Sequence, residues 1–431
     1  MKSIIYIGIF SFWATVATAQ NYYFPPLTGT TWDAVTPQSL GWCADKVDAL
    51  YNYLDTTNTK AFIVLKNGNI VMEKYFGTFT RDSNWYWASA GKTFTGLAVG
   101  IAQQEGFLNI NDSTSKYLGR GWTSATPAQE GKITIKNQLT MTSGLRDIGV
   151  DNDCTLPSCL QYLADAGTRW AYHTGAYTLL DGVIEAATGQ NFNVYTTAKI
   201  RNKIGMNGLF FKVGYNNLNF TTARSMARFG LLLLNKGKWG STVVLSDTAY
   251  FRQMTTTSQN LNPSYGYLTW LNGKTGFLAP GSQVTIPGSV SRDAPAEMYA
   301  ALGKNGQLIN VVPSQGLVFI RVGNNPDNLL VPFLYNNEIW KRLNAVICNR
   351  VGTVENGQNT EGSDFTISPN PSTSSSVEFS QMLTGYVLNS LGQVVIKFSN
   401  PTTHLSVQNL PNGVYFVKAN GYKTKHLVIQ N

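Results

Sequence analysis

Apolar and polar residues follow two different periods along the first 350 residues of this chain. The run AFIVLKNGNIVMEKYF at 61–76 predicts two strands around Asn67-Gly68, a pair typical of tight hairpin turns. Near the other end, residues 298–323 predict two more strands, joined around Pro313 and Gly316. Strand-like alternation therefore lies at both ends of this region.

Helical spacing dominates between those ends. The run TARSMARFGLLLLNKG at 222–237 has apolar residues three and four apart and ends in a glycine. A second helix is predicted over 89–106, where Phe94 and Leu97 share an apolar face. Strands at both ends with helices between them predict an α+β domain. In such a domain an antiparallel sheet, built from the first and last segments, is flanked by helices.

The last part of the chain has a different composition. Residues 350–363, RVGTVENGQNTEGS, are polar and lack periodicity, which predicts a linker. Residues 364–431 hold short alternating runs between turns rich in Pro, Gly and Asn, and these predict a small C-terminal β-sandwich. This segment offers no plausible pair of nucleophile and base, so no chemistry is assigned to it.

The first residues, MKSIIYIGIFSFWATVATAQ, have the pattern of a secretory signal. Lys2 supplies a positive start, residues 4–13 are mostly apolar, and Ala17-Thr18-Ala19 is a cleavage site. We therefore expect a signal peptide at 1–19 and the main domain at 20–349. An uncleaved membrane anchor is the alternative, but the apolar run is short for a bilayer span, and no later stretch is long and apolar enough to be one.

Export would allow disulfides, and the four cysteines are even in number. Cys154 and Cys159 flank TLPS and could close a small loop, while Cys43 and Cys348 lie near the ends of the main domain and could join them. Three pairings are open, as is a set of free thiols. No cysteine spacing indicates zinc, and three histidines supply few ligands, so no metal or cofactor is predicted.

The overall composition narrows the class of protein. Hydrophobic residues make up 43% of the chain and charged residues 13%, which excludes bulk disorder. The net charge is +9, but the basic residues are scattered. A solvated surface is therefore preferred to nucleic-acid binding.

One short stretch raises a chemical question. WYWASAGKTFTG at 85–96 places Ser89 three residues before Lys92, in the first turn of the predicted helix. On a helix this spacing brings hydroxyl and amine within hydrogen-bond reach. The positive helix end favours a developing alkoxide, and burial lowers the pKa of a lysine toward that of a useful base. A serine needs such help to act as a nucleophile.

The S-x-x-K spacing is weak by itself, because about one or two matches are expected by chance in such a chain. Ser113 to Lys116 is one such match, in a polar stretch predicted to lie at the surface. Ser89 alone would be more simply explained as a helix cap. No G-x-S-x-G elbow occurs, which counts against an α/β-hydrolase, and a Ser-His-Asp triad would have to use His173.

Several ordered motifs resemble those of the serine β-lactamase-like hydrolases. This family includes class C β-lactamases, D-Ala-D-Ala carboxypeptidases, family VIII carboxylesterases and 6-aminohexanoate-dimer hydrolases. Ser89-Ala90-Gly91-Lys92 matches the nucleophile motif, LTMTSGL at 139–145 is similar to L-x-x-x-T-S-G-L, and residues 170–177 resemble the segment that carries Y-x-N. MARFGLLLLNKGKW and YGYLTW resemble the helix and strand that follow. The resemblance covers about residues 40–347. It implies the β-lactamase/transpeptidase-like fold, with a helical subdomain beside the sheet.

The resemblance also implies roles for individual residues. Ser89 would attack the substrate carbonyl and form an acyl-enzyme. Lys92 and Tyr172 would share the proton transfers, with Tyr172 as the general base that then protonates the leaving group. The third motif aligns with Ala301-Leu302-Gly303, so the backbone N–H groups of Ser89 and Lys304 would stabilise the oxyanion.

Two departures from the family pattern concern the substrate. Tyr172-His173-Thr174 lacks the asparagine of Y-x-N, and Ala301-Leu302-Gly303 lacks the first residue of K-T-G or H-T-G. In relatives that process β-lactams these residues help to hold the substrate's amide and carboxylate. β-Lactams and peptidoglycan stems are therefore less favoured. The stretch at 299–323 is more similar to 6-aminohexanoate-dimer hydrolases and some esterases, which favours an esterase or amidase.

Simpler roles stand beside these assignments. Tyr172 could be a core tyrosine, and His173 is expected to be a bystander rather than a base. Thr174 is expected to face the site, with Gly303 and Lys304 as the other substrate-binding or oxyanion residues. The aromatic residues before the serine fit an acyl pocket and the core about equally well: Trp85, Tyr86 and Trp87.

The tail resembles the type IX secretion C-terminal sorting domain of Bacteroidetes. The matching pieces are SPNPS, the L-G-Q turn, LPNGVYFV and the terminal KTKHLVIQN. This resemblance implies passage across the outer membrane, with the type IX machinery as partner, followed by removal of the tail or surface attachment. A carbohydrate-binding or adhesive β-module is the alternative.

The sequence therefore predicts a secreted or cell-surface serine hydrolase that acts on a small-molecule or oligomeric ester or amide. One competing interpretation is a non-catalytic binding protein that kept the fold, since two of the three motif regions have drifted. Another is a β-lactamase or D-Ala-D-Ala carboxypeptidase. No nucleic-acid partner and no transmembrane segment after signal cleavage are expected.

Overall fold

The computed structural model describes residues 21–325, 327, 329–348, 364–389, 394–419, 422 and 425–430. The chain divides into two compact units, Met1–Asn349 and Arg350–Asn431. The predicted signal peptide at 1–19 and the predicted linker at 350–363 lie outside the described residues.

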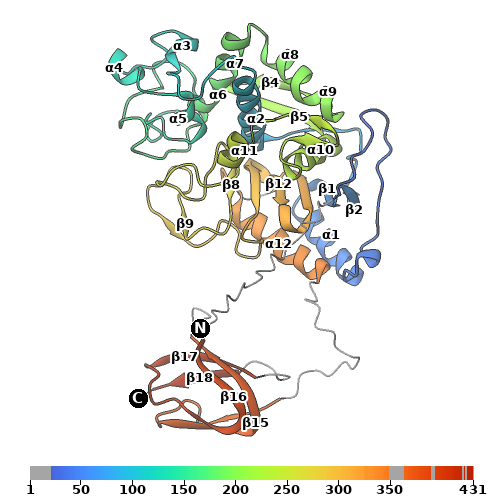
Figure 1. Ribbon diagram of the computed structural model, residues 1–431, viewed down its shortest axis with the longest axis vertical. Coiled ribbons are helices and arrows are strands. Elements are labelled where there is room, and N and C mark those ends of the chain that lie inside the picture. Colours follow the sequence, from blue (N-terminus) through green and yellow to red (C-terminus); the bar gives the residue numbers. More distant parts are fainter. Residues whose placement is uncertain are drawn as a thin grey trace, which may run out of the picture. The chain divides into compact units, whose positions relative to one another are not determined.

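A six-stranded antiparallel sheet forms the centre of the first unit (Figure 1). Its strand order is β2-β1-β13-β12-β11-β8, so strands from the two ends of the unit are hydrogen-bonded neighbours, as the sequence predicts. The β1–β2 hairpin turns at Asn67-Gly68. The strands of this sheet are β1 Thr59–Lys66, β2 Asn69–Tyr75, β8 Trp270–Leu271, β11 Tyr299–Gly303, β12 Gln307–Val312 and β13 Leu317–Gly323.

Residues 298–323 form three strands where the sequence predicted two. The additional turn lies between β11 and β12, where Asn305 (φ 62°) and Gly306 (φ 78°) are both left-handed. An Asn-Gly pair adopts this geometry easily and reverses the chain within two residues. The two-strand prediction is wrong because this pair ends one strand and starts the next.

Helices surround the sheet and build a second lobe beside it (Figure 1). This lobe holds α3 to α9 and a small sheet of order β3-β5-β4. The helices are α1 Val47–Thr56, α2 Gly91–Gln104, α3 Ser115–Leu118, α4 Pro127–Glu130, α5 Ile135–Leu139, α6 Thr174–Thr178, α7 Leu180–Thr188, α8 Phe192–Thr196, α9 Asn202–Ile204, α10 Ala223–Leu234, α11 Thr248–Met254 and α12 Phe333–Ile347. The other strands of the unit are β3 Asn84–Tyr86, β4 Leu209–Val213, β5 Asn216–Thr222, β6 Lys238–Trp239, β7 Thr242–Val243, β9 Gly276–Phe277 and β10 Ile286–Pro287.

Helices cover both faces of the main sheet. On one face, α10 approaches so closely that a side chain at Gly230 would collide with Val318. On the other face, Trp340 of α12 packs against Phe319 and donates a hydrogen bond to Asn310 Oδ1 at 2.9 Å. Because successive strand residues point to opposite faces, Val318 and Phe319 place α10 and α12 on opposite sides of the sheet.

Two disulfides are present in this unit. Cys43, just before α1, is bonded to Cys348 at the end of α12, and their Cα atoms are 5.7 Å apart. Cys154 is bonded to Cys159 across five positions. Of the three pairings that the sequence left open, the structure has the one that joins the ends of the main domain and closes a small internal loop.

The second unit is an all-β tail. Among its described residues the strands form one antiparallel sheet, in which β16 pairs along β15 while β14 and β17 pair with the two ends of the other edge of β15. The sheet curls around apolar side chains such as Val377, Val387 and Leu427. The tail therefore has one curled sheet rather than the two facing sheets of a sandwich. Its strands are β14 Ile367–Ser368, β15 Ser376–Leu388, β16 Val394–Ser406, β17 Gly413–Ala419 and β18 Lys425–Ile429.

Candidate active site

Ser89 lies in a short 3-10 turn, Ala88–Ala90, directly before α2. The regular helix begins at Gly91, two residues later than predicted. Ala88 has a φ of 46°, a left-handed value that is strained for alanine. Trp87 anchors this turn, since its ring is fully buried and its indole N–H donates to a threonine hydroxyl at 2.7 Å. The turn thus holds Ser89 half-buried at the N-terminal end of α2.

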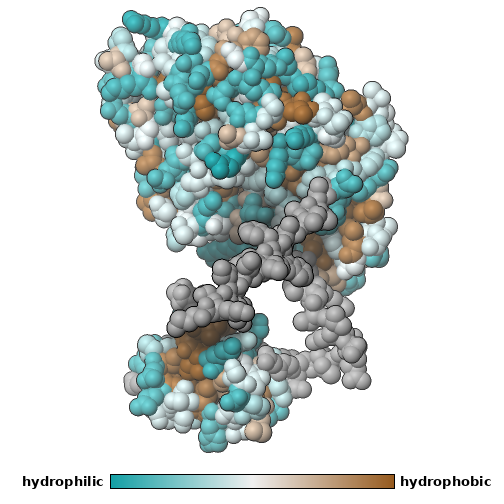
Figure 2. All heavy atoms as spheres, in the orientation of Figure 1, coloured by the Kyte–Doolittle hydropathy of each residue, from teal (hydrophilic) through white to brown (hydrophobic). Residues whose placement is uncertain are grey.

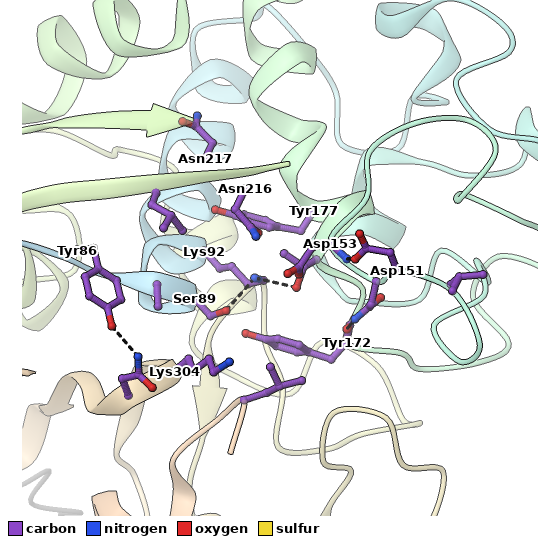
Figure 3. A pocket seen from close by; sticks show the side chains of 17 residues that line it. Tyr86, Ser89, Lys92, Asp151, Asp153, Tyr172, Tyr177, Asn216, Asn217 and Lys304 are labelled. Carbon is purple, nitrogen blue, oxygen red and sulfur yellow. Dashed lines mark hydrogen bonds between the residues drawn. The ribbon is translucent and has the colours of Figure 1, made fainter. Parts of the chain in front are cut away.

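Lys92 follows one helical turn later and is almost entirely buried, with 2% of its surface exposed. Its Nζ atom donates to Ser89 Oγ at 3.0 Å and lies 3.5 Å from Thr174 Oγ1 (Figure 3). Burial lowers the pKa of Lys92 to about 7, against the opposing effect of the Asp153 carboxylate. A large fraction of this lysine is therefore a neutral amine near neutral pH, which can accept the serine proton.

Tyr172 brings a phenol to the same serine. Tyr172 lines the same cavity as Ser89, and the side chains of Ser89 and Trp270 oppose the rise of its pKa. Its ring stacks on Trp270, with centroids 5.8 Å apart and planes 25° apart, and meets Tyr265 nearly edge-on at 6.2 Å. Burial raises the pKa of Tyr172 well above its ordinary value, so the side chain stays a phenol. The ring of Tyr172 thus belongs to the core, while its hydroxyl faces the site.

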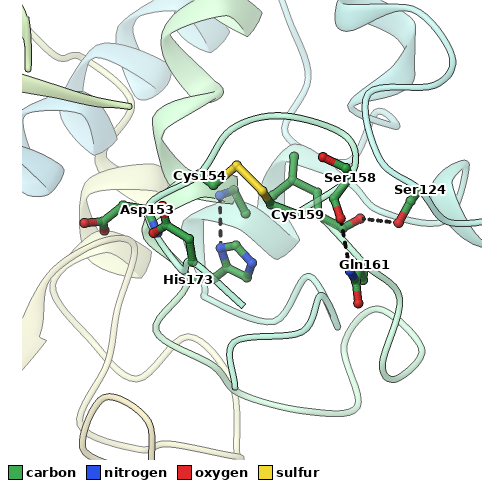
Figure 4. Close-up of a disulfide and its surroundings, with 10 residues drawn as sticks. Ser124, Asp153, Cys154, Ser158, Cys159, Gln161 and His173 are labelled. Carbon is green, nitrogen blue, oxygen red and sulfur yellow. Dashed lines mark hydrogen bonds between the residues drawn. A yellow bond between two sulfur atoms is a disulfide. The ribbon is translucent and has the colours of Figure 1, made fainter. Parts of the chain in front are cut away.

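His173 has a structural role next to these residues. It caps the start of α6, where its Nδ1 accepts from the Ala176 backbone N–H at 3.2 Å (Figure 4). Burial lowers the pKa of His173 to about 4, which keeps the ring neutral. The ring does not line the cavity at Ser89, whereas the next residue, Thr174, does. The structure therefore places His173 as the cap of α6, outside the cavity lining.

The third motif region places Gly303 directly behind the serine. A Cβ atom on Gly303 would lie 2.4 Å from the Trp87 carbonyl oxygen and 3.1 Å from the Ser89 backbone nitrogen, so only glycine fits here. The next residue, Lys304, lines the cavity. The end of β11 therefore runs beside the nucleophile turn, as a pair of oxyanion donors at Ser89 and Lys304 would require.

A buried arginine holds the turn between β11 and β12. Arg321 of β13 is fully buried and donates to the backbone carbonyls of Asn305 at 2.7 Å and Gly306 at 3.0 Å. On the cavity side, the Tyr86 hydroxyl accepts from Asn305 Nδ2 at 2.7 Å (Figure 3). The turn that carries Lys304 is therefore held from two sides.

These groups open into a cavity of about 500 Å³. Figure 3 shows Ser89 and Lys92 between Tyr86 on one side and the acidic residues Asp151 and Asp153 on the other. No hydrogen bond or ion pair reaches the Asp153 carboxylate from the residues that the structure describes. Its negative charge is therefore felt mainly by its neighbours in the cavity.

The small disulfide lies directly behind this acidic loop (Figure 4). Cys154 follows Asp153, and the loop is braced against the second motif by two hydrogen bonds of 2.8 Å. Gly175 N–H donates to the Asn152 carbonyl, and Asn152 Nδ2 donates to the Tyr172 carbonyl. The disulfide loop thus positions the wall that faces Lys92.

Two residues near the lysine were not found by sequence reasoning. Tyr177 lines the cavity, and its ring centre lies 4.3 Å from Lys92 Nζ. Asp153 acts electrostatically on Lys92, Tyr172 and His173. Tyr177 lies in α6, five positions after Tyr172, a separation that by itself does not place it at the cavity. Asp153 comes from a loop whose path depends on the whole fold.

The aromatic stretch before the serine divides between core and cavity. Trp87 is in the core, Trp85 packs half-buried against it, and Tyr86 alone of the three lines the cavity. The chance match at Ser113 to Lys116 is only partly at the surface: Lys116 is exposed and pairs with the carboxylate of a neighbouring aspartate at 2.7 Å, whereas Ser113 is half-buried. Neither residue lines the cavity at Ser89.

No cluster of His, Cys, Asp or Glu suited to a metal ion occurs within the described parts of the chain. In the same parts, none of the helices combines the length and the apolar character that crossing a membrane requires. On the face of the first unit that Figure 2 shows, hydrophilic residues are interspersed with hydrophobic ones.

Comparison with known proteins places this geometry in a family. The β-lactamase family profile matches residues 55–330, and the profile of the secretion system C-terminal sorting domain matches residues 366–430. An uncharacterized protein of Alkalihalophilus pseudofirmus is 23% identical over 316 residues, which cover 63% of this chain and 85% of that protein.

Solved structures show the same fold at low identity. One, assigned as a 6-aminohexanoate-dimer hydrolase from Bacillus anthracis, has a TM-score of 0.56 and 19% identity, covering 73% of this chain and 87% of that chain. A penicillin-binding protein homolog from Caulobacter crescentus has a TM-score of 0.55 and 15% identity, covering 73% of this chain and 98% of that chain. With the profile match over most of the first unit and a serine–lysine pair at the start of α2, the chain belongs to the β-lactamase family of serine hydrolases.

Proposed function

We propose that this protein is an exported serine hydrolase that cleaves an ester or amide bond through an acyl-enzyme on Ser89. The observation that carries the proposal is the 3.0 Å hydrogen bond between Lys92 Nζ and Ser89 Oγ, made by a lysine whose pKa burial lowers to about 7. A binding protein has no physical need for a buried, half-neutral amine against a serine hydroxyl, since burying an amine costs stability. The non-catalytic alternative is therefore less favoured.

The proton chemistry that we propose differs from the sequence assignment in one respect. The sequence assigned the base to Tyr172, but burial raises the pKa of that phenol and lowers the pKa of Lys92. The neutral amine of Lys92 is then the stronger candidate to take the serine proton as Oγ attacks the carbonyl carbon. The oxyanion that forms accepts hydrogen bonds from the backbone N–H groups of Ser89 and Lys304.

Collapse of the tetrahedral intermediate breaks the bond to the leaving group. The leaving group takes a proton from the Tyr172 hydroxyl, and the Lys92 ammonium returns a proton to Tyr172. Water then attacks the acyl carbonyl with Lys92 again as base, and Ser89 Oγ leaves with a proton. In this scheme Lys92 must be neutral before each attack, so kcat/KM rises as pH increases through about 7.

The cavity supports an ester or amide substrate without a strong requirement for a carboxylate. Thr174 stands where β-lactam-processing relatives have an asparagine, and Ala301 stands where they have lysine or histidine. Ala301 is buried in β11 and offers no charge. Besides Lys92, Lys304 is the lysine that lines the cavity among the described residues, and it stands one position after the third motif rather than within it. A small or oligomeric ester or amide of open specificity therefore fits better than a β-lactam.

The tail supports export by a type IX secretion system. Its match to a secretion system sorting domain covers residues 366–430, and the described part of the tail is a self-contained β unit with its own apolar core. Together with the predicted signal at 1–19, this supports a secreted or cell-surface location, with the type IX machinery as the partner of the tail.

The central experiment is acyl-enzyme trapping. The purified protein is exposed briefly to p-nitrophenyl butyrate, and intact mass and peptide mapping locate any adduct. We expect one acyl group on the peptide that contains Ser89, and release of nitrophenol at a rate that falls by about 10⁴-fold or more in Ser89→Ala.

The control is Ser113→Ala, because Ser113 belongs to the other S-x-x-K match and does not line the cavity, so turnover should stay unchanged. Full turnover in Ser89→Ala would refute the acyl-enzyme. Absence of both adduct and turnover across a panel of esters, amides and β-lactams would favour the non-catalytic alternative.

A further inference from the structure

The polar support of the Lys92 amine is sparse. Nζ has a hydrogen bond of ordinary length, 3.0 Å, to Ser89 Oγ, and its second polar neighbour, Thr174 Oγ1, is 3.5 Å away, at the limit of a hydrogen bond. An ammonium group has three donors, so a lysine that becomes protonated here has too few acceptors. Something else must offset the loss of water around the charge.

Two aromatic rings enclose the same nitrogen. Nζ lies 4.3 Å from the ring centre of Tyr177 and 5.0 Å from that of Tyr172. The π face of an aromatic ring attracts a cation, and the attraction grows when water is excluded. Tyr177 is 5% exposed and Lys92 is 2% exposed, so both groups are desolvated.

The Tyr177 ring is held in place from the helix that carries the lysine. Its hydroxyl lies 3.4 Å from the hydroxyl of Thr95, which is three residues beyond Lys92 on α2. The opposite ring, Tyr172, is held by its stacking on Trp270. The two rings are therefore preorganised on either side of the amine.

We propose that Tyr177 is a positioning residue, whose ring face stabilises the Lys92 ammonium that forms each time the serine gives up its proton. This inference rests on the proposed function of Lys92 as the base. Tyr177 would thus affect catalysis only by stabilising Lys92, and it would not contact the reacting bond.

Among the titratable groups near Lys92, the neighbouring tyrosines and His173 are neutral, so they do not supply a charge that stabilises the ammonium. From the loop before the small disulfide, Asp153 raises the pKa of Lys92. Tyr172 and Tyr177 stay neutral phenols because burial raises their pKa values, and His173 stays neutral because burial lowers its pKa to about 4. Asp181, one helical turn beyond Tyr177, has a pKa that burial raises to about 7.

The test compares pH profiles of kcat/KM for p-nitrophenyl butyrate in three proteins. Tyr177→Phe keeps the ring and removes the hydroxyl, while Tyr177→Leu removes the ring. We expect the limb that reports Lys92 to stay in place in the Phe variant and to move about one pH unit lower in the Leu variant. The plateau rate should also fall in the Leu variant because a less basic amine is a weaker base.

Two further variants serve as controls for folding and for the Asp181 carboxyl. Tyr177→Met replaces the ring by a flexible chain and repeats the test if the Leu variant fails to fold. Asp181→Asn identifies any limb that belongs to that carboxyl. A limb that stays at the wild-type pH in both the Leu and Met variants would overturn the proposal, as would an equal shift in the Phe variant.

A second measurement does not depend on turnover. Competitive labelling with acetic anhydride, followed by peptide mass spectrometry, titrates the Lys92 amine directly against pH, with Lys304 as an accessible internal reference. A lower midpoint in Tyr177→Leu and an unchanged one in Tyr177→Phe support the role of the ring, and unchanged midpoints in both refute it. This outcome is separate from the Ser89 adduct experiment, so failure of the proposed hydrolase function can be told apart from failure of this inference.

Discussion

Burial acts on Lys92 and Tyr172 in opposite chemical directions. It makes the lysine easier to deprotonate and the tyrosine harder to deprotonate, because in both cases the neutral form is favoured. Above about pH 7 the result is a neutral amine and a neutral phenol at the cavity of one serine hydroxyl. Such a pair can pass a proton from nucleophile to leaving group without holding a net charge between turnovers.

We predict that Tyr172→Phe lowers kcat/KM far more than a substitution of His173 does. Loss of the Tyr172 hydroxyl should lower kcat/KM by about a thousandfold, as expected for a proton-transfer group. His173→Asn should retain most activity, since asparagine also caps helix starts. Steady-state kinetics with the same ester measure both.

The matched control for the histidine is His173→Ala. It should lose about 1 kcal/mol of stability through the missing cap while its kcat stays close to wild type. If His173→Asn lost as much activity as Tyr172→Phe, the histidine would have to replace the tyrosine in the proton path.

Single residues were predictable from the sequence where a local motif carried them. Ser89 and Lys92 are three positions apart on one element, so their contact depends only on helical geometry. Tyr172 required a resemblance, because it reaches the serine from another segment. Asp153 and Tyr177 were missed because their proximity to Lys92 is a product of loop path and packing, which short-range spacing does not encode.

Gly303 joins two elements, the end of strand β11 and the nucleophile turn. We predict that Gly303→Ala lowers kcat by about a hundredfold or more, because the new Cβ pushes on the Trp87 carbonyl and the Ser89 amide and displaces an oxyanion donor. KM should change much less than kcat, since the donor acts mainly in the transition state.

Gly182→Ala is the control for this change. Gly182 lies in helix α7, and its Cβ would meet only the flexible end of a leucine at 3.3 Å. Equal kcat values in the Gly303 and Gly182 variants would show that the close approach of β11 to the nucleophile turn does not contribute to catalysis. Thermal unfolding of both proteins separates a loss of fold from a loss of rate.

The elements themselves were predicted with uneven success. The β1–β2 hairpin and α10 follow from strong local patterns, and the sheet that joins the two ends of the unit follows from strands at both ends. The β11–β12 turn was missed although Asn305-Gly306 repeats the turn pair of the β1–β2 hairpin, because the stretch around it was interpreted as the third catalytic motif. The curl of the tail sheet depends on long strands that pair with different partners along their length.

At the scale of the whole molecule, the proposed hydrolysis and the proposed export belong to different units. We predict that a chain lacking residues 364–431 hydrolyses the ester with unchanged kcat/KM, because the site lies entirely within the first unit. In the native host the same deletion should leave the enzyme inside the outer membrane. Cell fractionation with an activity assay measures both results.

The full-length protein expressed in parallel is the control for delivery. Normal surface delivery of the shortened chain would contradict the sorting role of the tail. A loss of activity in the purified shortened chain would mean that the tail also supports the hydrolase unit.

The bond between Cys43 and Cys348 has a topological consequence. It closes residues 43–348 of the first unit into a covalent ring. This ring contains all of the proposed catalytic residues, and the tail is not part of it. A protease that cuts once anywhere between these cysteines leaves both fragments tied together, whereas one cut between residues 349 and 363 frees the tail completely. A single cut between residues 349 and 363 would therefore release the tail, while a single nick inside the ring leaves the first unit covalently joined.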